Sequence, residues 1–168
     1  QDGHLLIRPM RPPDPDDLAS GFQHQGWHKE RELFSSYLDM QEKGIRMVFT
    51  AEVEGKAVGY TTLVRLAAEG PFQGRYPEIV DFNVLIPFRK RGIGSRILDA
   101  AESAAKQWSG TVTLGVGLHS GYGSAQRMYV KRGYIPDGSG VWYRDTPLRQ
   151  YAPCVNADDL VLFFSKLV

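Results

Sequence analysis

The sequence has little of what several large protein classes require. One cysteine, Cys154, among 168 residues excludes an internal disulfide and a cysteine metal cluster. The longest apolar run, Leu160 to Phe164, is far shorter than the roughly 20 residues of a membrane span. The net charge is +1, from 20 Lys and Arg against 19 Asp and Glu, which gives no electrostatic basis for binding nucleic acid or an anionic membrane. No secretory signal is visible, so we expect a cytoplasmic protein.

The four histidines show no pattern of metal ligands. His24 and His28 are four residues apart, but Gly26 lies between them and no acidic third ligand follows at helical spacing. We therefore expect no metal site. Apolar residues at 42% and charged residues at 23% are ordinary for a globular chain, and the length suits one domain. We expect residues 1–168 to form that single domain.

Hydrophobic periods and turn residues predict alternating strands and helices. Asp14 is expected to cap the first helix, with Pro15 in its first turn, and Glu54-Gly55 predicts a hairpin. In chain order we predict a strand at 5–7, helices from 14 and over 29–43, strands at 47–53, 57–64 and 78–85, a helix from 93, a strand at 111–118, a helix over 124–132, and strands at 141–144 and 160–167. This order is typical of an α/β fold, with helices on both faces of a mixed sheet.

The segment from Asp81 to Arg96 carries the strongest functional signal. A strand ends there, a basic turn with glycines follows, and a helix begins. The free N–H groups of a helix N-terminus attract anions, and Gly92 and Gly94 let the backbone approach a phosphate closely. Four of the eight residues from Arg89 to Arg96 are basic. The segment therefore predicts a pyrophosphate site, although such a turn can also simply begin a helix on a solvated surface.

The spacing of the glycines distinguishes between phosphate ligands. The dinucleotide pattern GxGxxG fails at Ile97, and no Walker Lys-Ser/Thr pair exists, which disfavours a nucleotide-binding regulator. The pattern present, Arg89-x-x-Gly92-x-Gly94, resembles motif A of the GNAT superfamily of acyl-CoA-dependent N-acetyltransferases. A second stretch is similar to motif B of that family, with matching residues at Ala125, Met128, Tyr129, Gly133 and Tyr134.

The resemblance covers Leu5 to Leu167 and implies a three-layer α/β/α fold with a mixed, splayed central sheet. It implies transfer of an acetyl group from acetyl-CoA to a primary amine of a small molecule or peptide, by direct attack. Two positions depart from the family pattern. Tyr122 replaces an Asn that contacts the pantetheine arm, and Pro87 comes one place late. A non-catalytic acyl-CoA sensor or partner-binding module of the same fold is the alternative.

The resemblance also implies the coenzyme-binding residues. Backbone amides of Val84 and Leu85 take the place of those that hold the acetyl carbonyl, and Arg89 opens motif A. The amides expected at the pyrophosphate are those of Arg91, Gly92, Ile93, Gly94, Ser95 and Arg96.

Proton transfer needs an acid for the thiolate and a base for the amine. Tyr129 takes the position of the family's general-acid tyrosine, unless it is a core aromatic. Asp81, near the thioester end of its strand, is the expected base. Strand alternation places Glu78 on the opposite face, so at most one of the two faces the cleft. His119 is the alternative base, because its ordinary pKa suits neutral pH.

The acceptor site is expected in segments that vary within the family. Trp27, Phe72, Tyr76 and Glu78 are the predicted wall residues, and Glu69 can add to a small acidic stripe with Glu78 and Asp81. These residues do not specify which amine is acetylated. A homodimer is compatible with the fold, and nothing in the sequence reports on it.

Overall fold

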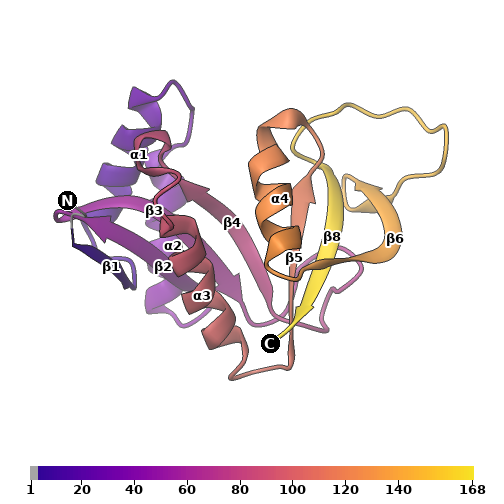
Figure 1. The fold of residues 1–168 in the computed structure, drawn as a ribbon, viewed down its shortest axis with the longest axis horizontal. Coiled ribbons are helices and arrows are strands. Elements are labelled where there is room, and N and C mark those ends of the chain that lie inside the picture. The colour runs from indigo at the N-terminus through magenta and orange to yellow at the C-terminus, as the bar shows by residue number, and fades with distance from the viewer. Residues whose placement is uncertain (1–3) are drawn as a thin grey trace.

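The computed structural model describes residues 4–168, and its elements follow the predicted order closely (Figure 1). In chain order they are β1 (Leu5–Arg8), α1 (Asp14–His24), α2 (Arg31–Glu42), β2 (Met47–Val53), β3 (Lys56–Val64), β4 (Glu78–Val84), a 3-10 turn (Ile86–Phe88), α3 (Ile93–Ala105), β5 (Thr111–Gly117), a second 3-10 turn (Ser120–Tyr122), α4 (Gly123–Lys131), β6 (Ile135–Tyr143), β7 (Thr146–Pro147) and β8 (Leu160–Leu167).

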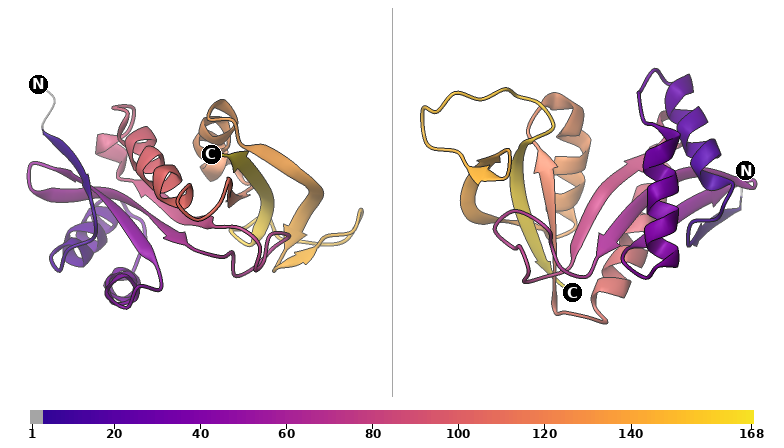
Figure 2. Two further views of the ribbon diagram at one scale, coloured as in Figure 1. Left: turned by 90° about the horizontal axis from the view of Figure 1, so that it is seen from below. Right: turned by 180° about the vertical axis from the view of Figure 1, so that it is seen from behind.

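One mixed sheet of eight strands, in the order β1-β2-β3-β4-β5-β8-β6-β7, forms the central layer. All neighbours are antiparallel except β4 and β5, which are parallel. Figure 2 shows α3 and α4 on one face of this sheet and α1 and α2 on the other. The predicted three-layer α/β/α architecture is confirmed. Between residues 4 and 168, none of the helices combines the length and apolar composition that crossing a membrane would take.

The sheet is split between its two parallel strands. β4 and β5 pair only at Glu78 with Thr113 and at Ile79 with Leu114. Beyond these pairs the two strands diverge toward their carboxyl ends (Figure 1). The closed end is held by Thr113, whose amide and hydroxyl both donate to the Pro77 carbonyl, at 2.9 Å each. The splayed sheet expected from the family resemblance is thus present, with the gap at the edge where α3 begins.

Two apolar clusters support the split sheet. In the first half, Phe22 and Phe34 of the α1–α2 layer pack on Tyr60 of β3, and the Phe34 and Tyr60 ring centroids lie 5.2 Å apart. In the second half, Leu114 and Phe164 pack in a cluster that also receives α3 and α4 side chains. This second cluster also contains Leu63 of β3 and Ile79 of β4, so it joins the two halves of the sheet where the split is closed.

Three details differ from the predicted elements. Asp14 lies inside α1 and does not cap it; its buried carboxylate instead accepts hydrogen bonds from the Arg8 guanidinium and the Arg11 amide. α3 ends at Ala105, whereas the helical spacing of apolar residues from Ile93 to Trp108 predicts a longer helix. β6 starts at Ile135 rather than Val141, because its register shifts between Pro136 and Val141 around the Gly-rich residues 137–140, which conceal the strand pattern.

A buried ion cluster joins the two halves near the closed end of the split. Glu102 of α3, only 8% exposed, accepts hydrogen bonds from Arg132 at 2.7 Å, Tyr134 at 2.8 Å and Lys166 of β8 at 3.0 Å. Burial opposes ionisation of this carboxyl, but the three donors outweigh it and lower the pKa of Glu102. The cluster connects α3 to the end of α4 and to β8, and so fixes one end of the gap.

We expect Glu102→Ala to lower the free energy of unfolding by about 3–5 kcal/mol, because it leaves Arg132 and Lys166 without their buried counter-ion. Asp99→Ala is the matched control: Asp99 bonds the same Arg132 at 2.8 Å, but its side chain is 62% exposed. Its loss is expected to cost at most about 1 kcal/mol. Urea unfolding of the two variants measures the difference, and equal losses would contradict a structural role for the cluster.

Candidate active site

The turn before α3 presents backbone N–H groups at one side of the gap. The first intrahelical bond of α3 runs from the Arg96 amide to the Gly92 carbonyl, at 3.1 Å. The amides of residues 93–95 therefore precede the hydrogen-bonded part of the helix and have no acceptor within it. Together with the positive end of the helix dipole they form an anion site. The Arg96 amide, by contrast, is already used within the helix.

The two glycines of the turn serve different purposes. Gly92 adopts φ +78°, in the left-handed region that glycine favours. A Cβ on Gly94 would lie 2.9 Å from the Phe82 ring of β4 and 3.3 Å from the terminal methyl of Met128 on α4. Gly94 therefore lets the start of α3 pack tightly against the walls of the gap, whereas the sequence suggested only closeness to a phosphate.

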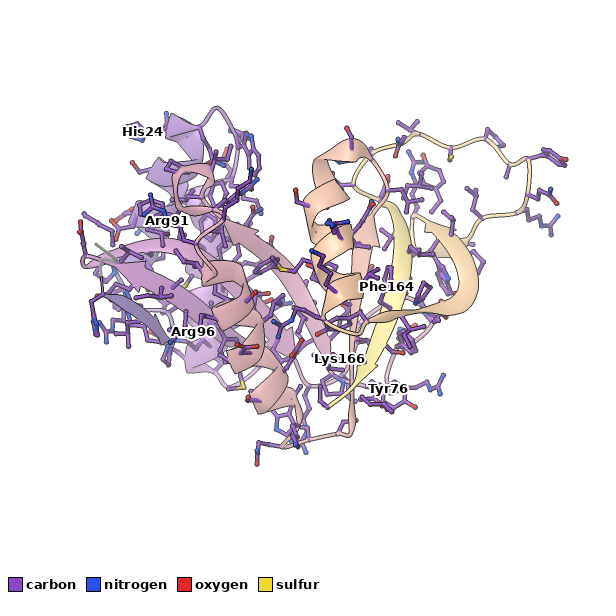
Figure 3. The ribbon with its side chains drawn as sticks, in the orientation of Figure 1. His24, Tyr76, Arg91, Arg96, Phe164 and Lys166 are labelled. Carbon is purple, nitrogen blue, oxygen red and sulfur yellow. The ribbon has the colours of Figure 1, made fainter. Side chains whose placement is uncertain are left out.

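The arginines of the motif divide into two groups. Arg91 and Arg96 are exposed, and Figure 3 shows both in the half of the molecule that holds α3, away from Phe164 and Lys166 of β8. Arg89 instead bonds within the protein: its Nε donates to the Val84 carbonyl at 2.8 Å, and its guanidinium lies 5.2 Å from the centre of the Trp27 ring. All three arginines are exposed, and within residues 4–168 Arg89 is the one of them whose side chain makes hydrogen bonds to the protein.

The end of β4 distinguishes the two amides expected at the acetyl carbonyl. The Leu85 N–H donates to the Val58 carbonyl of β3 at 2.9 Å. In an antiparallel pair, hydrogen-bonded and non-bonded residues alternate, so the N–H of Val84 points away from β3, toward the gap. The Leu85 amide is therefore engaged inside the sheet, and the Val84 amide is the one directed to the open side.

A β-bulge in β4 changes which face its side chains reach. Tyr60 pairs with Asn83 and Thr62 with Val80, so two residues of β4 lie opposite one residue of β3. Asp81, with φ +59°, is one of these two; Asp tolerates this conformation better than most residues. The expected simple alternation between Glu78 and Asp81 is wrong. By register Glu78 shares the face of Thr62, and the bulge turns Asp81 to that same α1–α2 face.

Asp81 accepts hydrogen bonds from two side chains on the α1–α2 face. Lys29 donates to its Oδ1 at 2.9 Å, and the Tyr37 hydroxyl donates to its Oδ2 at 2.8 Å. Lys29 also donates to the Tyr60 hydroxyl at 2.8 Å. Burial, and then the charge of Asp81, raises the pKa of both tyrosines, so they stay protonated. Both carboxylate oxygens of Asp81 therefore already accept hydrogen bonds.

Glu78 has a different environment at the start of the same strand. It is 6% exposed, and its Oε2 is buried without a hydrogen-bond partner among the described residues. Burial, followed by the negative charge of Glu69, raises its pKa to about 7, against an opposing effect of Arg46. Glu78 is thus a carboxyl that changes charge close to neutral pH.

Tyr129 of α4 lies at the other wall of the gap. It is 6% exposed, and its ring centroid lies 6.4 Å from that of Phe82 on β4. Burial, and then the charge of Asp81, raises the pKa of Tyr129, so the hydroxyl keeps its proton at any physiological pH. The structure therefore brings Tyr129 and Asp81 to opposite sides of the same split.

His119 lies beyond the end of β5 in a polar cluster. Its Nδ1 accepts the Gly121 amide at 3.0 Å, which leaves the proton on Nε2, and Nε2 donates to Asp158 Oδ1 at 2.9 Å. The Tyr122 hydroxyl donates to the same oxygen at 2.9 Å, and the Tyr122 ring covers Gly117. The bonds from His119 and Tyr122 lower the pKa of Asp158. Both ring nitrogens of His119 are thus engaged in holding the loop before β8.

The aromatic residues expected at the acceptor site occur in two places. Trp27 lies in the α1–α2 connection, 38% exposed and next to Arg89. Phe72 and Tyr76 lie in the loop between β3 and β4, with ring centroids 5.9 Å apart, and pack in a cluster with Phe163 of β8. Figure 3 places Tyr76 at the β8 half of the molecule. They therefore flank the split from its two sides.

Several site residues were not found from the sequence. Lys29 of the α1–α2 connection and Tyr37 of α2 bond Asp81, and Tyr60 of β3 bonds Lys29. No local sequence pattern predicts contacts between residues so far apart in the chain. Asp158 lies in a long loop with no periodic signal. One signal did exist: Asp is depleted in strand interiors, so Asp81 itself marked an irregularity in β4.

Comparisons with known proteins agree with this geometry. Residues 13–134, more than half of the chain, match the model of the acetyltransferase (GNAT) family. A search of curated protein sequences finds no match. Among solved structures, ribosomal-protein-alanine N-acetyltransferase from Brucella melitensis is 18% identical, with a TM-score of 0.70 over 97% of this chain and 99% of that one. An N-acetyltransferase from Staphylococcus aureus is 14% identical, with a TM-score of 0.70 over 98% of each chain.

A GNAT family acetyltransferase from Elizabethkingia anophelis, solved with acetyl-CoA bound, is 18% identical, with a TM-score of 0.65 over the whole of both chains. At these identities the structures establish the common fold. The family match is independent of them, and it spans both the turn before α3 and all of α4. The chain therefore belongs to the acetyltransferase (GNAT) family.

Proposed function

We propose that this acetyltransferase transfers an acetyl group from acetyl-CoA to a primary amine of a small molecule or peptide by direct attack. The observation that carries the proposal is the split between β4 and β5, with the amides of residues 93–95 at one edge and the protonated Tyr129 at the other. The solved relative with bound acetyl-CoA supports the choice of donor. The anion site suits its pyrophosphate, and Arg91 and Arg96 add positive charge.

The reaction needs a neutral amine nitrogen at the thioester carbonyl carbon. The ammonium form gives up a proton to a base, and the neutral nitrogen forms the C–N bond. As the C–S bond breaks, the same nitrogen releases its second proton to water, which leaves a neutral amide. The thiolate then receives a proton from an acid. In this assignment a backbone amide of β4 that is open to the gap faces the carbonyl oxygen, where a hydrogen bond stabilises the negative charge that develops there.

Glu78 is the base that the geometry favours, in place of Asp81. Both oxygens of Asp81 accept hydrogen bonds, and both nitrogens of His119 are engaged. Glu78 keeps one oxygen without a partner, and its pKa of about 7 is matched to a proton acceptor at neutral pH. Asp81 then acts by fixing Lys29 and Tyr37 and by the effect of its charge on Tyr129.

Acetyl-CoA and a panel of amines, followed by detection of the released thiol, test the proposed function. Thiol release that requires both substrates supports it. Binding of acetyl-CoA without release for any amine would favour the sensor of the same fold instead.

Tyr129→Phe is expected to lower kcat by about 10- to 100-fold, because the thiolate then leaves without a positioned acid. The dissociation constant of acetyl-CoA should change by less than about threefold, since the ring and its packing on Phe82 are retained. Stopped-flow thiol detection and calorimetry measure the two quantities. Tyr134→Phe, which removes a neighbouring hydroxyl bonded to Glu102, is the matched control and should keep kcat. An unchanged kcat in Tyr129→Phe would contradict the role of Tyr129 as the acid and would mean that its ring serves only in packing.

A further inference from the structure

Beside Glu78, the α1–α2 face of the sheet is covered by loop and β8 side chains and not by a helix, since α1 and α2 lie over the N-terminal strands (Figure 2). Glu78 pairs with Thr113 across the closed end of the split, and Gly115 follows Thr113 on the same face of β5. Gly115 is exposed and contributes no side chain; a Cβ there would lie 2.9 Å from Val161 and 3.0 Å from Phe163 of β8. Val161 and Phe163 thus crowd Gly115 from the side of β8, and the exposed backbone of Gly115 is the point on β5 that an acceptor amine can contact near Glu78.

Two exposed carboxylates border this approach. The Gly70 amide donates to Asp145 Oδ1 at 2.7 Å, which joins the β3–β4 loop to the turn between β6 and β7. That bond brings Glu69, the residue before Gly70, close to Asp145. We call Glu69 and Asp145 the acidic rim. Gly70 itself lies over the Phe163 ring, where a Cβ would meet the ring at 2.5 Å, so the rim is anchored on the same face as Gly115.

The acidic rim acts on the buried carboxyl below it. Glu78 is more than nine-tenths buried with its Oε2 unpartnered, and the charges of Glu69 and Asp145 both add to the effect of burial on its pKa. The neighbouring Arg144 is paired with Asp159 at 3.4 Å and so does not cancel the rim. Arg46, which opposes the shift, bonds Thr62 on the β3 side. The effect of Arg46 on the pKa of Glu78 is smaller than that of Glu69 and larger than that of Asp145, so the pKa of Glu78 stays raised.

We propose that the acceptor carries a second, positively charged nitrogen that binds the acidic rim while its reacting amine lies at Glu78. The acceptor class is a diamine or polyamine, and this inference rests on the proposed function. A cation at the rim also offsets the charges that oppose ionisation of Glu78. It therefore makes the base more available in the complex than a monoamine does.

The test compares kcat/KM for 1,4-diaminobutane and n-butylamine, which match in length and differ in one ammonium group. We expect the wild type to prefer the diamine by about tenfold at low ionic strength, from two partly exposed charge pairs, and less at 0.3 M salt. The acid limb of kcat should lie at lower pH with the diamine. Glycyl-lysine amide, whose second charge lies farther along a peptide, distinguishes a peptide from a small polyamine.

The variant Glu69→Gln with Asp145→Asn removes both rim charges. Asn keeps an acceptor for the Gly70 amide and tolerates the φ of +59° at position 145. The diamine-to-monoamine ratio is expected to fall to about two or less. Glu32→Gln, an exposed carboxylate on α2, should keep the wild-type ratio.

Equal kcat/KM for the two amines in the wild type, or a tenfold ratio that survives in the rim variant, would overturn the inference and leave the acetyltransferase intact. A preference for the dipeptide over the diamine would overturn the small-polyamine class. Absence of thiol release with every amine would overturn the proposed function along with it.

Discussion

Glu78→Gln is expected to lower kcat for acetyl transfer by at least about 100-fold, with the affinity for acetyl-CoA nearly unchanged. Glutamine keeps the size of the side chain but cannot accept a proton. The position is buried at the closed end of the split, away from the turn before α3, so coenzyme binding should not respond. Steady-state kinetics and calorimetry measure the two effects.

The pH dependence of kcat/KM shows whether Glu78 or Asp81 is the base. In the wild type, kcat/KM should rise with pH through about 7, as Glu78 loses its proton. Glu78→Gln should lack this limb, whereas Asp81→Asn should retain it at a reduced rate. The reverse pattern would make Asp81 the base, as the sequence suggested.

Stability provides a check that the variant is folded. A raised pKa in the folded state means that the contribution of Glu78 to stability is complete below pH 4 and is lost as pH rises through about 7. At pH 8 the ionised side chain therefore costs up to about 3 kcal/mol. Glu78→Gln should melt at a higher temperature than the wild type at pH 8 and at a similar one at pH 4. Lower stability at pH 8 would mean that lost activity reflects misfolding.

The second large effect is expected at the anion site. Arg91→Ala combined with Gly94→Asp should weaken acetyl-CoA binding by at least about 100-fold. The first change removes an exposed cation. The second adds a carboxylate beside the amides of residues 93–95, and its Cβ presses on the Phe82 ring at 2.9 Å. Calorimetry with acetyl-CoA measures the loss, and dephosphorylated fragments of the coenzyme should lose less.

Two controls separate charge from packing in this experiment. Gly94→Ala makes the same contact with Phe82 without the charge, and its affinity should lie between the wild type and the double variant. Arg149→Ala, an exposed arginine in the loop before β8, removes one positive charge elsewhere and should bind normally. Equal affinity of the double variant and the wild type would mean that the turn before α3 does not bind the pyrophosphate.

Most of the fold was predictable, because local hydrophobic periodicity and turn residues indicate most of the strands and helices of this chain. β2 and β8 have the predicted bounds, and Gly44 and Gly133 follow the ends of α2 and α4. β6 was seen only in part, since Gly138 and Gly140 interrupt its pattern. β8 lies between β5 and β6 in the sheet. This order depends on pairing between strands far apart in the chain, which the hydrophobic periodicity of a local segment does not predict.

The site was predictable where it is continuous in sequence. The turn from Arg89 to Gly94 and the helix with Tyr129 each carry a motif, so their positions followed from spacing. The choice between Glu78 and Asp81 did not, because it depends on a bulge and on hydrogen bonds from Lys29 and Tyr37. Whether a carboxylate can act as the proton acceptor depends on its burial and on its hydrogen-bond partners, and both are set by the packing of the folded chain.

The divergence of β4 and β5 gives this sheet two inner edges in addition to its outer ones. A strand edge normally invites pairing with another chain, and proteins protect such edges. Here the two inner edges face each other, beneath α3 and α4. Backbone groups on these inner edges, such as the Val84 amide, have no partner strand. They can bond an extended molecule that is narrower than a polypeptide strand with its side chains. We therefore expect the inner edges to pair with a thin, extended ligand such as the coenzyme and not with a strand of another chain.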